Sequence, residues 1–123
     1  MIADCANGVV WIKGVIMKLG LERPILVSPS MSGAFSVPLV LNDIGLISGY
    51  VPVAAVKMKA LAEVDWAAAK VFALYMYGEK DISIGAAGAQ TFGAMAAAVP
   101  ETSPKFVQVF KLNKGFHQSK VAW

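Results

Sequence analysis

Short apolar segments, each bounded by turn residues, are the feature that most restricts how this chain can fold. Three of them run almost without interruption, at residues 25–27 (ILV), 49–56 (GYVPVAAV) and 71–77 (VFALYMY). A half-exposed strand alternates apolar and polar side chains, whereas a strand buried on both faces is a continuous apolar run. With helices between them and a last strand at residues 106–112, the runs predict an α/β fold with a mostly parallel sheet of about four strands and flanking helices.

Helical periodicity or alanine-rich composition predicts helices before the first strand and between the strands. The expected helices are residues 9–21, 34–41, 57–69 and 82–99. In the second of these, Pro38 is expected to kink or end the helix, because proline lacks the N–H that a helix interior requires. The length of 123 residues suits one domain, residues 1–123.

Composition excludes several classes of protein. The chain is 57% apolar and 15% charged, which is too apolar for a disordered protein. Its single cysteine can form neither an internal disulfide nor a multi-thiolate zinc site, which favours an intracellular, reducing location. The uncharged stretch between Arg23 and Asp43 has about the length of a membrane helix, but Pro24, Pro29 and Pro38 would interrupt it, so no membrane span is expected.

Binding of nucleic acid or of a dinucleotide is not predicted either. Gly85, Gly88 and Gly93 lie in an alanine-rich stretch, without the strand and Gly-x-Gly-x-x-Gly turn that a dinucleotide fold needs. The lysines near the C-terminus are not interleaved with aromatic residues and are interpreted as a solvated face. No metal site and no bound cofactor are predicted.

Serines follow the first strand, at the end where parallel sheets bind ligands. Residues 28–32 (SPSMS) have the pattern small-x-Ser-x-small. A nucleophile elbow needs this pattern because bulky residues two positions from the serine would collide with neighbouring backbone. Ser30 is then the candidate nucleophile. A register centred on Ser32, and a turn whose hydroxyls only cap the next helix, also fit these residues.

An acid and a histidine follow two later strands. Asp81 comes four residues after a buried run and is placed to orient an imidazole, although Glu79 in the same turn competes for this role. His117, the only histidine of the chain, follows the last strand. Serine, acid and histidine in this chain order match the order of the α/β-hydrolase triad.

Three stretches also resemble a known family, the α/β-hydrolase domain-containing protein 14 family. They are residues 23–38 (RPILVSPSMSGAFSVP), 49–54 (GYVPVA) and 74–81 (LYMYGEKD). The Ser-Pro-Ser-x-Ser-Gly elbow is the most specific of these similarities, and it favours the register centred on Ser30.

The resemblance implies an activity and the residues that perform it. Ser30 would be the nucleophile, Asp81 the triad acid, His117 the triad base, and the backbone N–H of Met31 an oxyanion donor. The family implies a serine hydrolase of the cytoplasm or nucleus that acts on small acyl esters. For one branch it implies transfer of an acetyl group from acyl-lysine to coenzyme A.

The similar stretches correspond to the C-terminal half of that fold, so the chain is interpreted as a truncated α/β-hydrolase domain. The strand at residues 25–27 would then have an open edge and uncovered apolar faces. The loop that lends the second oxyanion donor in this family also has no counterpart here, so weak activity or none is expected of this chain. The alternative is a non-catalytic hydrolase-like fragment that binds a partner or self-associates through the open sheet edge.

Overall fold

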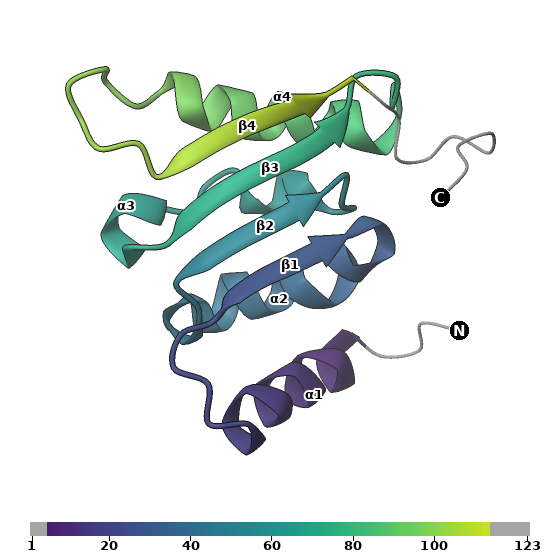
Figure 1. Cartoon of the computed structure of the whole chain (residues 1–123), viewed down its shortest axis with the longest axis vertical. Helices are drawn as coiled ribbons and strands as arrows, with labels where there is room; N and C mark the ends of the chain where they lie inside the picture. The colour runs from purple at the N-terminus through teal and green to yellow at the C-terminus, as the bar shows by residue number, and fades with distance from the viewer. Residues whose placement is uncertain (1–4, 114–123) are drawn as a thin grey trace.

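In the part of the chain that the structure describes, four strands that all run parallel form one sheet (Figure 1). The computed structural model describes residues 5–113. The strands are β1 (Ile25–Pro29), β2 (Gly49–Val53), β3 (Phe72–Gly78) and β4 (Val107–Leu112). Their order in the sheet is also their order in the chain. The predicted α/β fold with a parallel sheet is confirmed.

Among the described residues, four α-helices and three short 3₁₀ turns accompany the strands. The helices are α1 (Cys5–Lys18), α2 (Gly33–Asp43), α3 (Trp66–Ala69) and α4 (Ile84–Ala97). The 3₁₀ turns are Ser30–Ser32, Ile44–Leu46 and Met58–Leu61. Within residues 5–113, no helix has both the length and the apolar character needed to cross a membrane.

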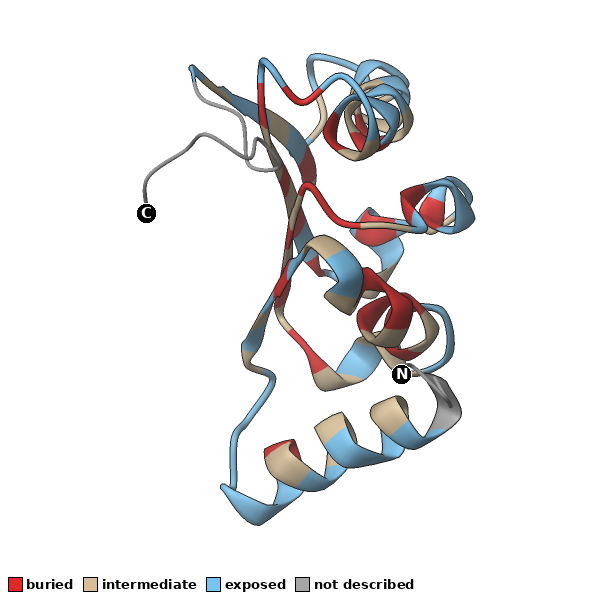
Figure 2. Cartoon of the chain, turned by 90° about the vertical axis from the view of Figure 1, so that its right-hand side faces the viewer, coloured by how far each residue is buried: buried red, intermediate tan, exposed pale blue. Residues whose placement is uncertain are grey.

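The helices all lie on one face of the sheet, as the edge-on view of Figure 2 shows. The connections that contain α2, α3 and α4 each lead to the next strand in the same direction across the sheet. Connections between parallel strands are almost always right-handed, so connections that advance in one direction place their helices on the same side. The continuous apolar runs predicted strands buried on both faces of the sheet. In the structure, helices cover only one of these two faces.

The core lies between the sheet and these helices. Tyr50 of β2 and Tyr75 of β3 are fully buried there. Trp66 stacks on Tyr50 with ring centroids 6.0 Å apart, and Phe92 stacks on Tyr75 at 5.1 Å. A Cβ at Gly88 would overlap the Tyr75 hydroxyl, so glycine at this position lets α4 lie close to β3. Aromatic rings from two strands are thus packed under two of the helices.

The opposite side of the sheet carries apolar side chains that the helices do not cover. We call it the open face and define it by Ile25, Val27, Val53, Phe72, Met76 and Phe110. Cross-strand pairing joins several of them, with Val53 opposite Met76 and Met76 opposite Phe110. Ile25 is 64% exposed and Phe72 is 60% exposed. The open face is therefore an apolar surface in contact with solvent.

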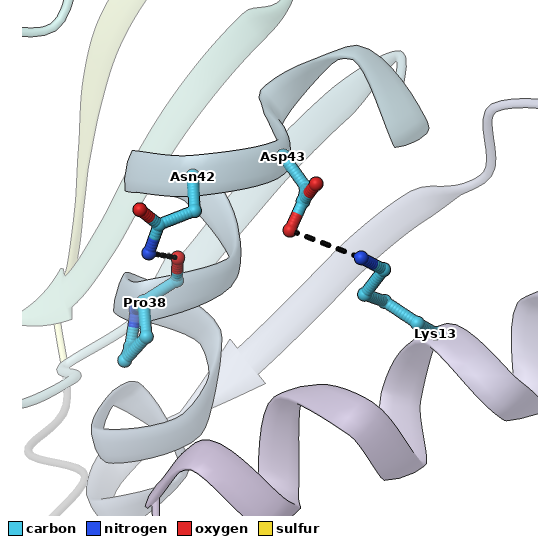
Figure 3. Close-up of polar contacts among 4 residues, drawn as sticks. All are labelled: Lys13, Pro38, Asn42 and Asp43. Atoms are coloured by element: carbon cyan, nitrogen blue, oxygen red, sulfur yellow. Dashed lines mark hydrogen bonds and ion pairs between the residues drawn. The ribbon is translucent and has the colours of Figure 1, made fainter.

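Helix α2 continues past Pro38, so the proline does not end it. The Asn42 side chain donates from Nδ2 to the Pro38 carbonyl oxygen at 2.8 Å (Figure 3). Next to it, Asp43 forms an ion pair of 3.3 Å with Lys13 and so joins α2 to α1 (Figure 3). Both charged side chains are about one third exposed, and such pairs contribute at most about 1 kcal/mol.

Residues 57–69 do not form the single helix that the sequence predicts. A 3₁₀ turn and the separate short helix α3 replace it. Asp65 caps α3 by accepting a hydrogen bond from the Ala68 backbone N–H at 3.0 Å, which favours a new helix start over continuation. Lys57, with a φ of +65°, keeps the segment from starting as a regular helix.

Candidate active site at the carboxyl edge of the sheet

Ser30 and Asp81 both lie where strands of the sheet end. Pro29 pairs with Val53, and Val53 pairs with Met76, so β1, β2 and β3 end at one edge. Ser30 is the first residue after β1, and Asp81 is the third residue after β3. The structure places the candidate nucleophile and the candidate acid at this carboxyl edge.

Ser30 occupies a strained backbone conformation. Its φ is +48°, in the left-handed region. This conformation costs free energy for any residue that has a side chain. Ser32, the centre of the other register, has an ordinary right-handed φ of −65°. A sharp turn between a strand and a helix is the backbone geometry of a nucleophile elbow. That geometry is centred on Ser30 rather than on Ser32.

The turn is packed against the segment that follows β2. The Val56 backbone N–H donates to the Ser30 carbonyl oxygen at 3.0 Å. A Cβ at Gly33 would overlap the Val56 carbonyl oxygen. Glycine at position 33 therefore allows two backbone segments to approach and to hold the strained turn in place.

A row of hydroxyl groups supports the turn from the core. Ser28 Oγ lies 2.8 Å from Ser32 Oγ and 2.7 Å from Ser36 Oγ, which in turn lies 2.7 Å from the Tyr50 hydroxyl. Ser32 donates its single proton to the Pro29 carbonyl oxygen at 2.6 Å. Each preceding hydroxyl must then donate toward the turn, from Tyr50 through Ser36 and Ser28 to Ser32.

Burial keeps the first donor of this row protonated. Desolvation raises the pKa of Tyr50, more than its hydrogen bonds with Ser36 and Ser28 lower it. Ser36 and Tyr50 were not among the residues predicted from the sequence. A serine within the apolar helix was the one available signal, and its partner lies 14 positions away on a neighbouring strand.

Asp81 is buried at the start of the turn that leads into α4. Its Oδ1 accepts hydrogen bonds from the backbone N–H and from the hydroxyl of Ser83, both at 3.3 Å. A Cβ at Gly85 would collide with the Asp81 carboxylate, so glycine there makes room for the acid. Burial raises the pKa of Tyr75 above its usual value, and the negative charge of Asp81 raises it further.

The other predicted site residues differ in how the structure places them. Glu79, the competing acid, is exposed, whereas Asp81 is only 4% exposed. Met31 follows Ser30 directly in the turn, and its side chain is exposed. His117 lies outside the described residues, so its role as triad base stays a prediction.

An open groove of about 1410 Å³ lies on the helix-covered side, between α3 and α4. Trp66 and Met95 are among its lining residues, but Ser30 and Asp81 are not. The two candidate catalytic residues therefore lie at the sheet edge, apart from this groove.

Comparison with known proteins finds relatives for part of the chain. It is 34% identical to Protein ABHD14A of Rattus norvegicus over 70 residues, which is 57% of this chain and 29% of the relative. It is 32% identical to Protein ABHD14A of Danio rerio over 75 residues, which is 61% of this chain and 28% of the relative.

A second group of relatives carries a functional name. The chain is 32% identical to human "Putative protein-lysine deacylase ABHD14B" over 71 residues, which is 58% of this chain and 34% of the relative. The chain thus spans about a third of the length of these relatives. No family profile and no solved structure matches it. Over about 60% of its length the chain is therefore similar to ABHD14A and ABHD14B, and its all-parallel sheet with flanking helices agrees with a partial α/β fold.

Proposed function

We propose that the chain carries the catalytic elbow of a serine hydrolase that acts on small acyl esters or acyl-lysine. Ser30 is the nucleophile, Asp81 the triad acid, His117 the triad base, and the Met31 backbone N–H an oxyanion donor. The observation that carries the proposal is the φ of +48° at Ser30. A strained residue in the sharp turn between a parallel strand and a helix is typical of this class of nucleophile.

The proposed reaction passes through an acyl-enzyme. Ser30 Oγ attacks the acyl carbon and its proton passes to His117, while the Met31 N–H stabilises the negative oxygen. The bond to the leaving alcohol or lysine amine then breaks, and the leaving group takes the proton from His117. Water, or the thiol of coenzyme A as acceptor, releases the acyl group from Ser30 in a second round of proton transfer.

Two features of the site support these roles. Asp81 is buried and held by Ser83, which suits an acid that orients an imidazole through a fixed hydrogen bond. The name of ABHD14B, a relative of this chain, favours acyl-lysine among the substrates. We expect weak turnover of this chain, and its rate to depend strongly on the Met31 N–H, since one oxyanion donor typically contributes about 10²–10³ in rate.

Labelling with a fluorophosphonate probe tests the nucleophile. We expect slow covalent labelling of the wild-type chain, with the adduct located on Ser30 by mass spectrometry. Ser30→Ala should abolish it, whereas Ser32→Ala, the matched change in the same turn, should retain it. An adduct on Ser32, or equal labelling of Ser30→Ala, would overturn the assignment of Ser30.

The acid and the base are tested by the same labelling rate. Asp81→Asn and His117→Ala should slow it, and Glu79→Gln, which changes the exposed acid, should leave it unchanged. Hydrolysis of p-nitrophenyl acetate and of an acetyl-lysine peptide then distinguishes the two substrate classes. A complete absence of labelling in the folded wild-type chain would favour the non-catalytic alternative.

A further inference from the structure

The open face combines exposure with a lack of charge. Val27 on β1 is 59% exposed and Phe110 on β4 is 50% exposed, so the exposed side chains extend from one edge strand of the sheet to the other. Strands β1, β2 and β3 contain no charged residue at all. Lys111, the single charged residue of β4, pairs with Tyr77 and therefore points to the helix-covered face. A partner for the open face consequently has no charge to neutralise.

The size of the open face is sufficient for a specific interface. Four of its side chains, Ile25, Val27, Phe72 and Phe110, are at least half exposed. At roughly 100 Å² each they expose about 400 Å², which already equals the largest apolar patch of a typical monomer. Two copies that cover this area and the partly exposed side chains between them would bury about 1,000 Å², the lower limit for a specific interface.

We propose that the open face binds the open face of a second copy of this chain, to form a two-fold symmetric dimer. In an isologous contact the same patch meets itself, so an apolar, uncharged face is automatically matched by an apolar, uncharged face. Two twisted sheets pack face to face at about 10 Å with interdigitated side chains. The dimer then has two sheets inside and the helices of each copy outside.

Packing through the face explains more of the exposed surface than pairing through the edge of β1 does. Edge pairing would join two strands of only five residues, and Pro29 at the end of β1 has no N–H to donate. It would also leave Phe72 and Phe110 in water. The face-to-face contact covers these side chains and needs no new backbone hydrogen bonds.

Sedimentation of the 123-residue chain from about 1 to about 200 μM tests the dimer. The expected result is a reversible shift from the chain mass of 13.0 kDa to twice that mass, with a micromolar dissociation constant. A mass of 13.0 kDa at every concentration would overturn the proposal and would mean that another segment or partner covers the face. Species larger than a dimer would also overturn it, since an isologous contact closes at two copies.

Variants locate the contact. Phe110→Lys and Val27→Lys place a charge on the open face and should raise the dissociation constant at least about tenfold, while Phe110→Leu should keep the dimer. Met17→Lys changes a similarly exposed apolar side chain on α1, on the helix side, and should have no effect. An unchanged dimer in both lysine variants of the open face, with circular dichroism showing that they fold, would refute the assigned surface. Ser30→Ala should dimerise like the wild type, so this test is independent of the proposed activity.

Discussion

The strained turn at Ser30 makes an unusual prediction about stability. Replacement of Ser30 by glycine should give a more stable chain than replacement by alanine. Both substitutions remove the hydroxyl and all of its interactions, so the two variants differ only in the Cβ atom. A backbone φ of +48° is unfavourable for a residue with a Cβ, whereas glycine adopts it readily.

The size of the difference follows from two opposing effects. The left-handed conformation costs alanine about 1–2 kcal/mol, and glycine avoids this cost. Glycine loses about 0.4–1 kcal/mol because its unfolded chain has more conformations. The midpoints of these two ranges differ by about 0.8 kcal/mol, so the free energy of unfolding of Ser30→Gly should exceed that of Ser30→Ala by about this amount, equivalent to about 2–5 °C in Tm.

Urea denaturation followed by circular dichroism measures this difference. Gln90, an exposed residue inside α4, provides the matched control. There the order must reverse, with Gln90→Gly less stable than Gln90→Ala by about 1 kcal/mol. If alanine is also the more stable residue at position 30, the turn is not strained in solution, and the main support for an elbow at Ser30 is lost.

Three further predictions concern the elements that hold this turn and the core beneath it. Gly33→Ala should lower the free energy of unfolding by about 1–3 kcal/mol, because its Cβ would overlap the Val56 backbone; Gly14→Ala in α1, where the Cβ meets nothing within 4 Å, should not destabilise the chain. Ser36→Ala should cost about 1–3 kcal/mol in chemical denaturation by removing a partner from two buried hydroxyls, those of Ser28 and Tyr50. Thr91→Ala is the control, since the hydrogen bond that it removes, from the Thr91 hydroxyl to the Ala87 carbonyl oxygen, is exposed, and a cost of Ser36→Ala below that of Thr91→Ala would contradict the hydroxyl row. Burial raises the pKa of Tyr50 and of Tyr75 in the folded chain, so their contribution to stability is fully present below the unfolded pKa of about 10 and is lost as the pH rises above it. Absorbance of phenolate should accordingly show these two tyrosines ionising together with unfolding, and their ionisation in the fully folded chain would refute their burial.

Element type was predictable from the sequence where the pattern was long or strongly apolar. All four strands and the helices around residues 9–21, 34–41 and 82–99 occur in the structure, with ends shifted by a few residues. The segment 57–69 failed because a single side chain, Asp65, caps a new helix within an otherwise helical composition. Uncovered apolar surface was predicted for the strand at residues 25–27 from the resemblance, but an apolar run alone does not reveal which of its two faces has a neighbour.

The candidate site was predictable only in part. The placement of Ser30 and Asp81 at one edge of the sheet could be predicted because residues after parallel strands meet there. The hydroxyl row could not, because its members Ser36 and Tyr50 become neighbours only after α2 packs on β2. The left-handed φ of Ser30 likewise depends on Gly33 and Val56, which are remote in sequence from each other and close in space.

The match between strand order in the sheet and strand order in the chain has a consequence for synthesis. Each strand pairs with the one translated immediately before it, so the contacts of the growing sheet are short in sequence. A chain that leaves the ribosome from its N-terminus would extend its sheet one βα unit at a time, and no early strand must wait for a late one. Parallel sheets ordinarily fold slowly because their partners are distant, and this topology reduces that delay to the length of one connection.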